Sequence, residues 1–179
     1  MNFKKASIFR RGGDEAEAAQ PVDTQGGVLA VWGSPGSGKT VTAVKIAKHL
    51  ASQKKNVILL LCDMTAPMLP CICPPSDLEC DRSLGSVFAA QHIPVNLIKH
   101  NLTTHKKLSH LTMMGLQKGE NEYTYAACTK EQAEELLAGL REIAPYVVVD
   151  CSSYIANDIL TALYGQERTG SGSGTDRCA

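Results

Sequence analysis

One stretch of the sequence, residues 28–40 (VLAVWGSPGSGKT), constrains the fold more than any other, because an apolar run ends there in three glycines, a lysine and a threonine. Gly33, Gly36 and Gly38 let the backbone curl tightly enough to point successive N–H groups at one position, where a Cβ would obstruct the turn or a bound anion. The residues before the glycines resemble a strand, and residues 39–53 resemble a helix. The pattern GxxxxGK[ST] in this setting indicates a loop that binds the phosphates of a nucleotide.

The individual positions of this loop predict separate roles. We expect Lys39 to reach the β- and γ-phosphates and to act in catalysis, and Thr40 to offer its hydroxyl to Mg²⁺. The helix that starts here adds the positive end of its dipole beneath the phosphates. The residues expected to contact the nucleotide are Gly33, Ser34, Pro35, Gly36, Ser37, Gly38, Lys39, Thr40 and Val41.

A second apolar run, residues 56–63 (NVILLLCD), has the length of a strand that is buried on both faces. A strand, a helix and a strand in this order form a βαβ unit, so the two strands should be parallel and direct their carboxyl ends at the nucleotide. Asp63 ends the second strand and should lie near the phosphates. The helix between the strands carries an apolar stripe of Val41, Val44, Ile46, Ala47 and Leu50.

A third apolar run, at residues 145–150 (PYVVVD), ends in Asp150. The sequence TKEQ at Thr129 predicts a capping box that opens a helix through Glu142, and Pro145 stops this helix. An acidic residue after a buried strand can hold Mg²⁺ from the side opposite Thr40, so Asp150 is the second candidate magnesium ligand. The alternative is that Asp150 only ends the strand as a turn residue.

The middle of the chain gives weaker patterns. We expect a proline-rich loop without regular structure at residues 64–82, a short helix at 84–91, a short strand at 95–98 and another strand at 108–113. Three cysteines in the loop (Cys71, Cys73 and Cys80) could be metal ligands, but their spacing matches no common zinc or iron–sulfur pattern. The five histidines show no metal-binding grouping either.

Composition sets the broad class. The chain has 179 residues and a formal net charge of zero, so bulk charge gives no signal for nucleic acid. It contains no apolar run of the ~18 residues that span a bilayer and no secretory signal, so we expect a cytoplasmic protein that is not transmembrane. The expected organisation is a flexible leader at 1–27, a nucleotide-binding domain at 28–164 and a flexible Gly/Ser-rich tail at 165–179. An alternative for the leader is that Phe3, Ile8 and Phe9 touch a membrane surface.

Three segments together, GSPGSGKT, NVILLLCDMTAP and YVVVDCSS, resemble the MinD/ParA family of ATPases, and most closely its TadZ/CpaE members in pilus assembly and chromosome partitioning. The resemblance runs from about Val28 to Leu163. It implies a P-loop NTPase of the α/β class, with a mostly parallel sheet flanked by helices in three α/β/α layers, and ATP and Mg²⁺ as cofactors. It also implies that Asp63 positions the attacking water and that Asp150 serves Mg²⁺.

The sequence departs from that family in three places. Ser34 stands where the family's signature lysine is usual, CSSY follows Asp150 in place of proline and glycine, and the base-binding part expected after Tyr164 is replaced by the Gly/Ser tail. The resemblance implies a slow ATPase switch that positions cargo such as pilus machinery or DNA, acting with a homodimer partner or a polar-localisation protein. The alternatives are a nickel-insertion GTPase and a non-hydrolysing interaction module.

Overall fold

The computed structural model describes residues 26–74, 78–79, 81–125 and 127–151. The predicted leader, apart from its last two residues, and the predicted tail lie outside the described residues. So does the part of the predicted nucleotide-binding domain that follows Cys151.

Five strands form one sheet in the order β1-β5-β2-β4-β3. Their bounds are Gly27–Val31 (β1), Val57–Leu61 (β2), Thr103–Thr104 (β3), Leu111–Met114 (β4) and Tyr146–Asp150 (β5). β5 is parallel to both β1 and β2, β4 is parallel to β2, and β3 runs antiparallel to β4. The predicted parallel arrangement of the first two strands is therefore confirmed, and β5 lies between them.

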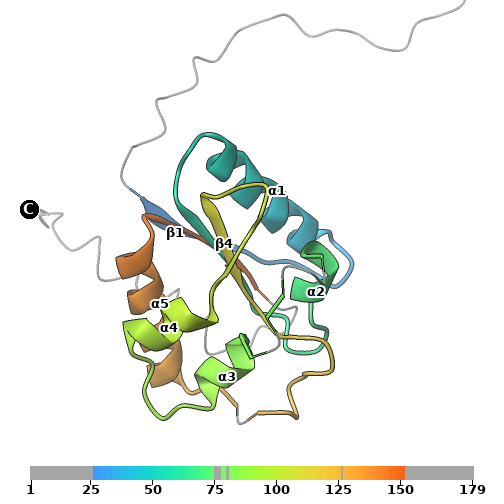
Figure 1. The fold of residues 1–179 in the computed structure, drawn as a ribbon. Coiled ribbons are helices and arrows are strands. Elements are labelled where there is room, and N and C mark those ends of the chain that lie inside the picture. The colour runs from blue at the N-terminus through green and yellow to red at the C-terminus, as the bar shows by residue number, and fades with distance from the viewer. Residues whose placement is uncertain (1–25, 75–77, 80, 126, 152–179) are drawn as a thin grey trace, which may run out of the picture.

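Helices cover both faces of this sheet (Figure 1). On one face lie α1 (Lys39–Ser52) and α2 (Leu69–Ile72), which share a buried cluster with Leu59, Leu61 and Val148. On the other face lie α3 (Leu84–Phe88), α4 (Val95–Asn101) and α5 (Lys130–Ile143), which pack on alternate residues of the same strands. The predicted three-layer α/β/α architecture, with a mostly parallel sheet, is the one observed.

The predicted apolar stripe of α1 is confirmed except at Val41: Ala47 is buried, and Val44, Ile46 and Leu50 pack partly buried against the same cluster. The fully buried residues of the helix are Ala43, Ala47 and Ala51, whereas Val41 is 57% exposed. Residues two positions apart on a helix point in nearly opposite directions, so a helix that turns Ala43 to the sheet turns Val41 to solvent. Alanines also let the helix axis approach the sheet closely, a choice that a pattern search for large apolar residues misses.

The helix α5 begins as predicted. The Thr129 hydroxyl accepts a hydrogen bond from Gln132 N (3.2 Å), and Gln132 Oε1 accepts one from Thr129 N (3.0 Å), which completes the capping box. The helix packs Leu136, Leu137 and Leu140 into the core and delivers the chain directly into β5.

Four predictions for the middle of the chain need correction. The strand predicted at residues 95–98 is wrong: these residues begin α4, which starts after the extended Pro94 and buries Ile98 beside Gly139 of α5. A window of four residues does not separate the periods of helix and strand. The loop predicted at 64–82 contains the single turn of α2, where Pro70 occupies a first-turn position that needs no N–H donor. The helix predicted at 84–91 and the strand predicted at 108–113 exist as the shorter α3 and as β4.

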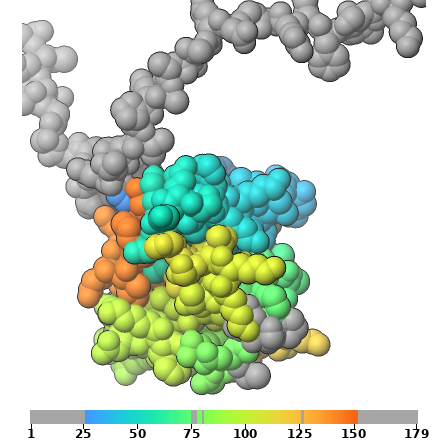
Figure 2. All heavy atoms as spheres, turned by 45° about the horizontal axis from the view of Figure 1, so that its top comes forward, coloured from blue at the N-terminus to red at the C-terminus, as the bar shows by residue number. Residues whose placement is uncertain are grey.

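The amino ends of β2 and β4 meet at one edge of the sheet. Val57 N donates to the His110 carbonyl (2.9 Å), and His110 Nδ1 lies 2.8 Å from Asn56 Oδ1. Figure 2 shows this edge, with the segment before β4 in yellow against the connection from α1 to β2 in teal. The carboxyl ends of the four parallel strands β1, β5, β2 and β4 lie at the opposite edge. Among the described residues, no helix is long and apolar enough to span a membrane.

Candidate functional site

The glycine loop (residues 32–38) connects the carboxyl end of β1 to α1. Gly36 has φ 74° and Gly38 has φ 81°, a left-handed backbone that other residues adopt only at a cost. Ser37 N donates to the Ser34 carbonyl (3.2 Å), and a Cβ on Gly33 would lie 2.8 Å from Ser37 Oγ. The backbone therefore favours glycine at Gly36 and Gly38, whereas a Cβ at Gly33 would only displace the Ser37 hydroxyl.

The loop leads into an α-helix whose N-terminus has no side-chain cap. Gly38 is the N-cap residue and has no side chain to offer, and the first backbone bond of the helix runs from Thr42 N to the Gly38 carbonyl (2.9 Å). Capping side chains usually accept from the N–H groups of the first turn, and anions bind well where such caps are absent.

Asp150 ends β5 at the same edge of the sheet. It lies between Val31 of β1 and Leu61 of β2, and the backbone on both sides is paired: Cys151 N donates to the Val31 carbonyl and Cys62 N to the Asp150 carbonyl, each at 2.9 Å. The residue is only 1% exposed, yet neither carboxylate oxygen has a hydrogen-bond partner among the described residues. Buried polar atoms are nearly always satisfied, so this orphaned carboxylate needs a reason.

The surroundings of Asp150 supply one. Burial raises the pKa of Asp150, the Thr40 hydroxyl and the Lys39 ammonium lower it, and the Asp63 carboxylate raises it. The structure thus brings together Lys39, Thr40, Asp63 and Asp150, four of the residues singled out from the sequence. The Thr40 hydroxyl lies near enough to the Asp150 carboxylate to favour its charged form. A buried carboxylate and a hydroxyl are hard oxygen donors, and they fit Mg²⁺.

Asp63 lies two residues beyond β2 and is half-buried. Its Oδ1 accepts hydrogen bonds from Thr65 N (3.0 Å) and Ala66 N (3.2 Å), which hold the side chain in a fixed position. No described residue donates to Oδ2. Asp63 therefore shapes its own turn with one oxygen and keeps the other for a ligand or a water molecule.

The two described cysteines of the proline-rich loop differ in their exposure. Cys71 is exposed, whereas Cys73 is buried and its thiol lies 3.8 Å from Met113 Sδ. Cys80 lies outside the described residues, and the described parts of the chain contain no group of three or more histidine, cysteine, aspartate or glutamate side chains that could hold a metal ion.

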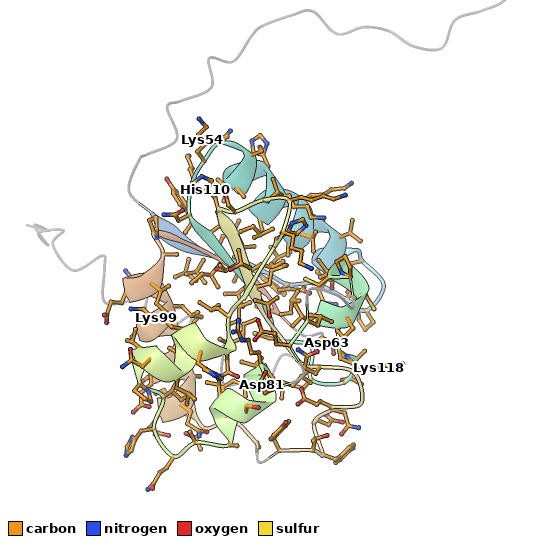
Figure 3. All side chains as sticks on the ribbon, viewed as in Figure 1. Lys54, Asp63, Asp81, Lys99, His110 and Lys118 are labelled. Atoms are coloured by element: carbon orange, nitrogen blue, oxygen red, sulfur yellow. The ribbon has the colours of Figure 1, made fainter. Side chains whose placement is uncertain are left out.

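The segment after β4 lies at the same edge of the sheet, and no sequence pattern predicted a role for it. Glu120 is its centre: the carboxylate accepts from Gln117 N (2.6 Å), from the Tyr125 hydroxyl (2.5 Å) and from the Ser83 hydroxyl. Hydrogen bonding to Glu120 raises the pKa of Tyr125. Figure 3 shows Lys118 and Asp63 toward one end of the molecule, and Lys54 and His110 at the other. The sequence signal for this segment was a polar run, KGENEY, placed soon after an apolar strand.

Solved structures with a similar fold support this description. The ParA family ATPase from Chlorobium tepidum TLS matches with a TM-score of 0.61 and 13% sequence identity over 77% of this chain. The kinase domain of VpsO matches with a TM-score of 0.51 and 22% identity over 78% of the chain. The MinD cell division protein of Aquifex aeolicus matches with a TM-score of 0.50 and 18% identity over 75% of it. This protein has the fold of the ParA and MinD ATPases. At these identities the likeness concerns the fold alone.

The comparisons also set the extent of the likeness. The chain spans 56% of the length of the Chlorobium protein, 66% of the VpsO kinase domain and 51% of the Aquifex protein. No protein-family model matches the sequence, and no curated protein sequence matches it significantly. The resemblance to TadZ and CpaE stays a prediction.

Proposed function

We propose that the protein binds ATP with Mg²⁺ and works as a slow ATPase switch of the MinD/ParA type. The observation that carries the proposal is the orphaned carboxylate of Asp150, buried to 1% exposure beside Thr40 and Lys39 at the end of the glycine loop. A buried, unpaired negative charge costs free energy unless a cation joins it. A Mg²⁺ ion carried in with a triphosphate removes that cost.

The loop provides the other half of the site. Its left-handed glycines and the uncapped N-terminus of α1 form an anion-binding turn, and Lys39 stands at the first helical position. Thr40 and Asp150 would hold Mg²⁺, whose chemistry is to neutralise charge on the phosphate oxygens. Asp63 Oδ2 is the acceptor we assign to the attacking water. Hydrolysis would then depend on positioning and charge neutralisation and not on covalent catalysis.

Turnover should be slow because of Ser34. In the family that this sequence resembles, a lysine at this position reaches the nucleotide of a partner subunit, and a serine cannot supply that charge. Ground-state binding uses Lys39, Thr40 and Asp150 and does not need Ser34. We therefore propose a protein that holds MgATP well, hydrolyses it slowly and positions cargo such as pilus machinery or DNA, in the cytoplasm and as a homodimer or with a localisation partner.

Equilibrium binding tests the first step. Trp32 is the chain's single tryptophan, is 61% exposed and directly precedes Gly33, so its fluorescence should report nucleotide binding. We expect ATP to bind more tightly with Mg²⁺ than without it, and Lys39→Ala to lose most of the affinity. Lys45→Ala, which removes an exposed lysine from the same helix, is the matched control.

A second variant separates the metal from the phosphates. Thr40→Ala should keep the Mg²⁺-free affinity for ATP and lose most of the gain that Mg²⁺ provides. Equal ATP binding by the natural protein and Lys39→Ala would refute the proposal, and so would a preference for GTP, which is expected of the nickel-insertion class.

A further inference from the structure

We propose that Lys118 places its ammonium group near the terminal phosphate of bound ATP. It would supply there the positive charge that Ser34 cannot supply. This inference rests on the proposed function, since it adds a residue to the same site. Four properties of Lys118 carry it: its place at the phosphate edge, the fixed turn that holds it, the lack of an ion pair and the charge balance of the site.

The first property follows from strand register. In the parallel pair of β2 and β4, Leu60 lies opposite Met114, so both strands end at the same edge. The chain still lies beside β2 after β4 ends. The close approach at Gly115 shows this, since a Cβ added there would lie 3.0 Å from Leu61 Cβ. Asp63 follows Leu61 by two residues and Lys118 follows Gly115 by three. Figure 3 draws both side chains toward the same end of the molecule.

The second property is the turn. Gly119 has φ 91°, and Glu120 N donates to the Gln117 carbonyl (3.1 Å) to close it. The Gln117 side chain donates to the carbonyls of Glu79 (3.2 Å) and Arg82 (2.7 Å). Residues on both sides of Lys118 are thus held in place. Gln117 is held by the hydrogen bonds that its side chain donates, and Glu120 by the hydrogen bonds that its carboxylate accepts.

The third property is what Lys118 itself does. Its side chain is exposed and forms no ion pair or hydrogen bond with any residue that the structure describes. Arg82, whose carbonyl accepts from the Gln117 side chain, is already engaged: Nη2 pairs with Glu79 (2.7 Å) and Nη1 donates to the Leu102 carbonyl (3.3 Å). The hydrogen bonds of Gln117 and Glu120 therefore order the turn but do not involve the Lys118 side chain. Its ammonium group remains available to a ligand.

The fourth property is charge. Asp63 and Asp150 place two carboxylates at this edge, and a triphosphate adds more negative charge than Mg²⁺ and Lys39 neutralise. Hydrolysis then builds further charge on the terminal phosphate oxygens, where a fixed cation acts most strongly. An ammonium group on a flexible four-carbon stem can reach such a position.

The experiment compares Lys118→Gln and Lys118→Arg with the natural protein and with Lys99→Gln, which removes an exposed lysine on α4. Single-turnover hydrolysis of MgATP should fall by about 10²-fold in Lys118→Gln, while the affinity for MgATP changes by less than about threefold. Lys118→Arg, which keeps the charge, should retain a rate within about tenfold of the natural one. Lys99→Gln should match the natural protein in both.

A second readout keeps the inference testable if turnover is too slow to follow. ADP with aluminium fluoride mimics the charge of the transferring phosphate, and Lys118→Gln should weaken its binding much more than it weakens ADP binding. Equal rates, or equal affinities for this complex, in the natural protein and Lys118→Gln would overturn the role of Lys118. If the natural protein binds neither MgATP nor this complex, the proposed function itself has failed, which is a different result.

Discussion

Replacing Asp150 by asparagine should stabilise the protein without ligand and destabilise it, relative to the natural chain, when MgATP is present. The carboxylate is 1% exposed and has no hydrogen-bond partner among the described residues, and burial raises its pKa, so its charge is a net cost to the protein without a bound cation. Asparagine keeps the shape and removes the charge. The same change removes a ligand that we assign to Mg²⁺, so the two conditions should rank the proteins in opposite orders.

The magnitude follows from the environment of the carboxylate. An unsatisfied buried polar group costs about 1–3 kcal/mol and a charged one costs more, but the amide is also buried, so we expect a net gain of about 1–2 kcal/mol. For a chain of this length, that gain raises the melting temperature by about 2–8 °C. MgATP at 100 times its Kd stabilises the natural protein by about 2.7 kcal/mol and should stabilise Asp150→Asn much less.

The pH dependence has a defined sign. Burial raises the pKa of Asp150 above the ordinary value for aspartate, so the folded protein holds this proton more tightly than the unfolded chain. The contribution of Asp150 to stability is therefore most favourable below the ordinary aspartate pKa and is lost as pH rises through the raised value. The advantage of Asp150→Asn should be absent at the acid end of this window and complete above it.

Differential scanning fluorimetry at several pH values, with and without MgATP, measures these effects. Asp81→Asn is the control, because Asp81 is an exposed aspartate (labelled in Figure 3) and its replacement should move the melting temperature little. The reasoning is refuted if Asp150→Asn melts below the natural protein without ligand, or if MgATP stabilises both proteins equally.

Three further predictions concern other parts of the chain. Ser34→Lys should speed single-turnover hydrolysis and promote ATP-dependent dimers, because it adds a cation whose analogues contribute roughly 10³–10⁵ in rate. Quenched-flow kinetics and light scattering measure the two effects. An unchanged rate would contradict this account of slow turnover. Thr129→Ala should lower the free energy of unfolding by about 1 kcal/mol in urea titrations, since it breaks the capping box of α5. Iodoacetamide should label the exposed Cys71 quickly and leave the buried Cys62 and Cys151 unmodified until the protein unfolds. Burial raises the pKa of the Cys151 thiol to about 11 and that of the Cys62 thiol well above its usual range, so neither forms the reactive thiolate readily. Mass spectrometry of the labelled native protein checks this pattern.

Much of the fold could be predicted because its strongest signals are local. The glycine loop, the buried strand β2 and the capping box of α5 each occupy a few consecutive residues whose types have direct physical causes. The predicted strand at residues 95–98 failed because its pattern is short and because the decisive contact, Ile98 against Gly139, joins residues 41 positions apart. Sequence patterns do not contain such contacts.

The candidate site divides in the same way. The sequence located Lys39, Thr40, Asp63 and Asp150 individually, because each follows a recognisable strand or glycine pattern. The sequence did not show that the carboxylate oxygens of Asp150 would lack hydrogen-bond partners among the described residues. That property depends on how β1 and β2 enclose the end of β5.

Lys118 illustrates the remaining gap between the sequence and the site. Nothing in its neighbourhood along the chain distinguishes it from other surface lysines, and its significance comes from two distant facts: β4 pairs with β2, and Glu120 ties the turn to Ser83. A site built where several parallel strands end draws one residue from each strand, so its parts are separated in sequence by whole βαβ units. Under the proposed function, a cation that Ser34 cannot supply can therefore come from the end of another strand, such as the segment that follows β4.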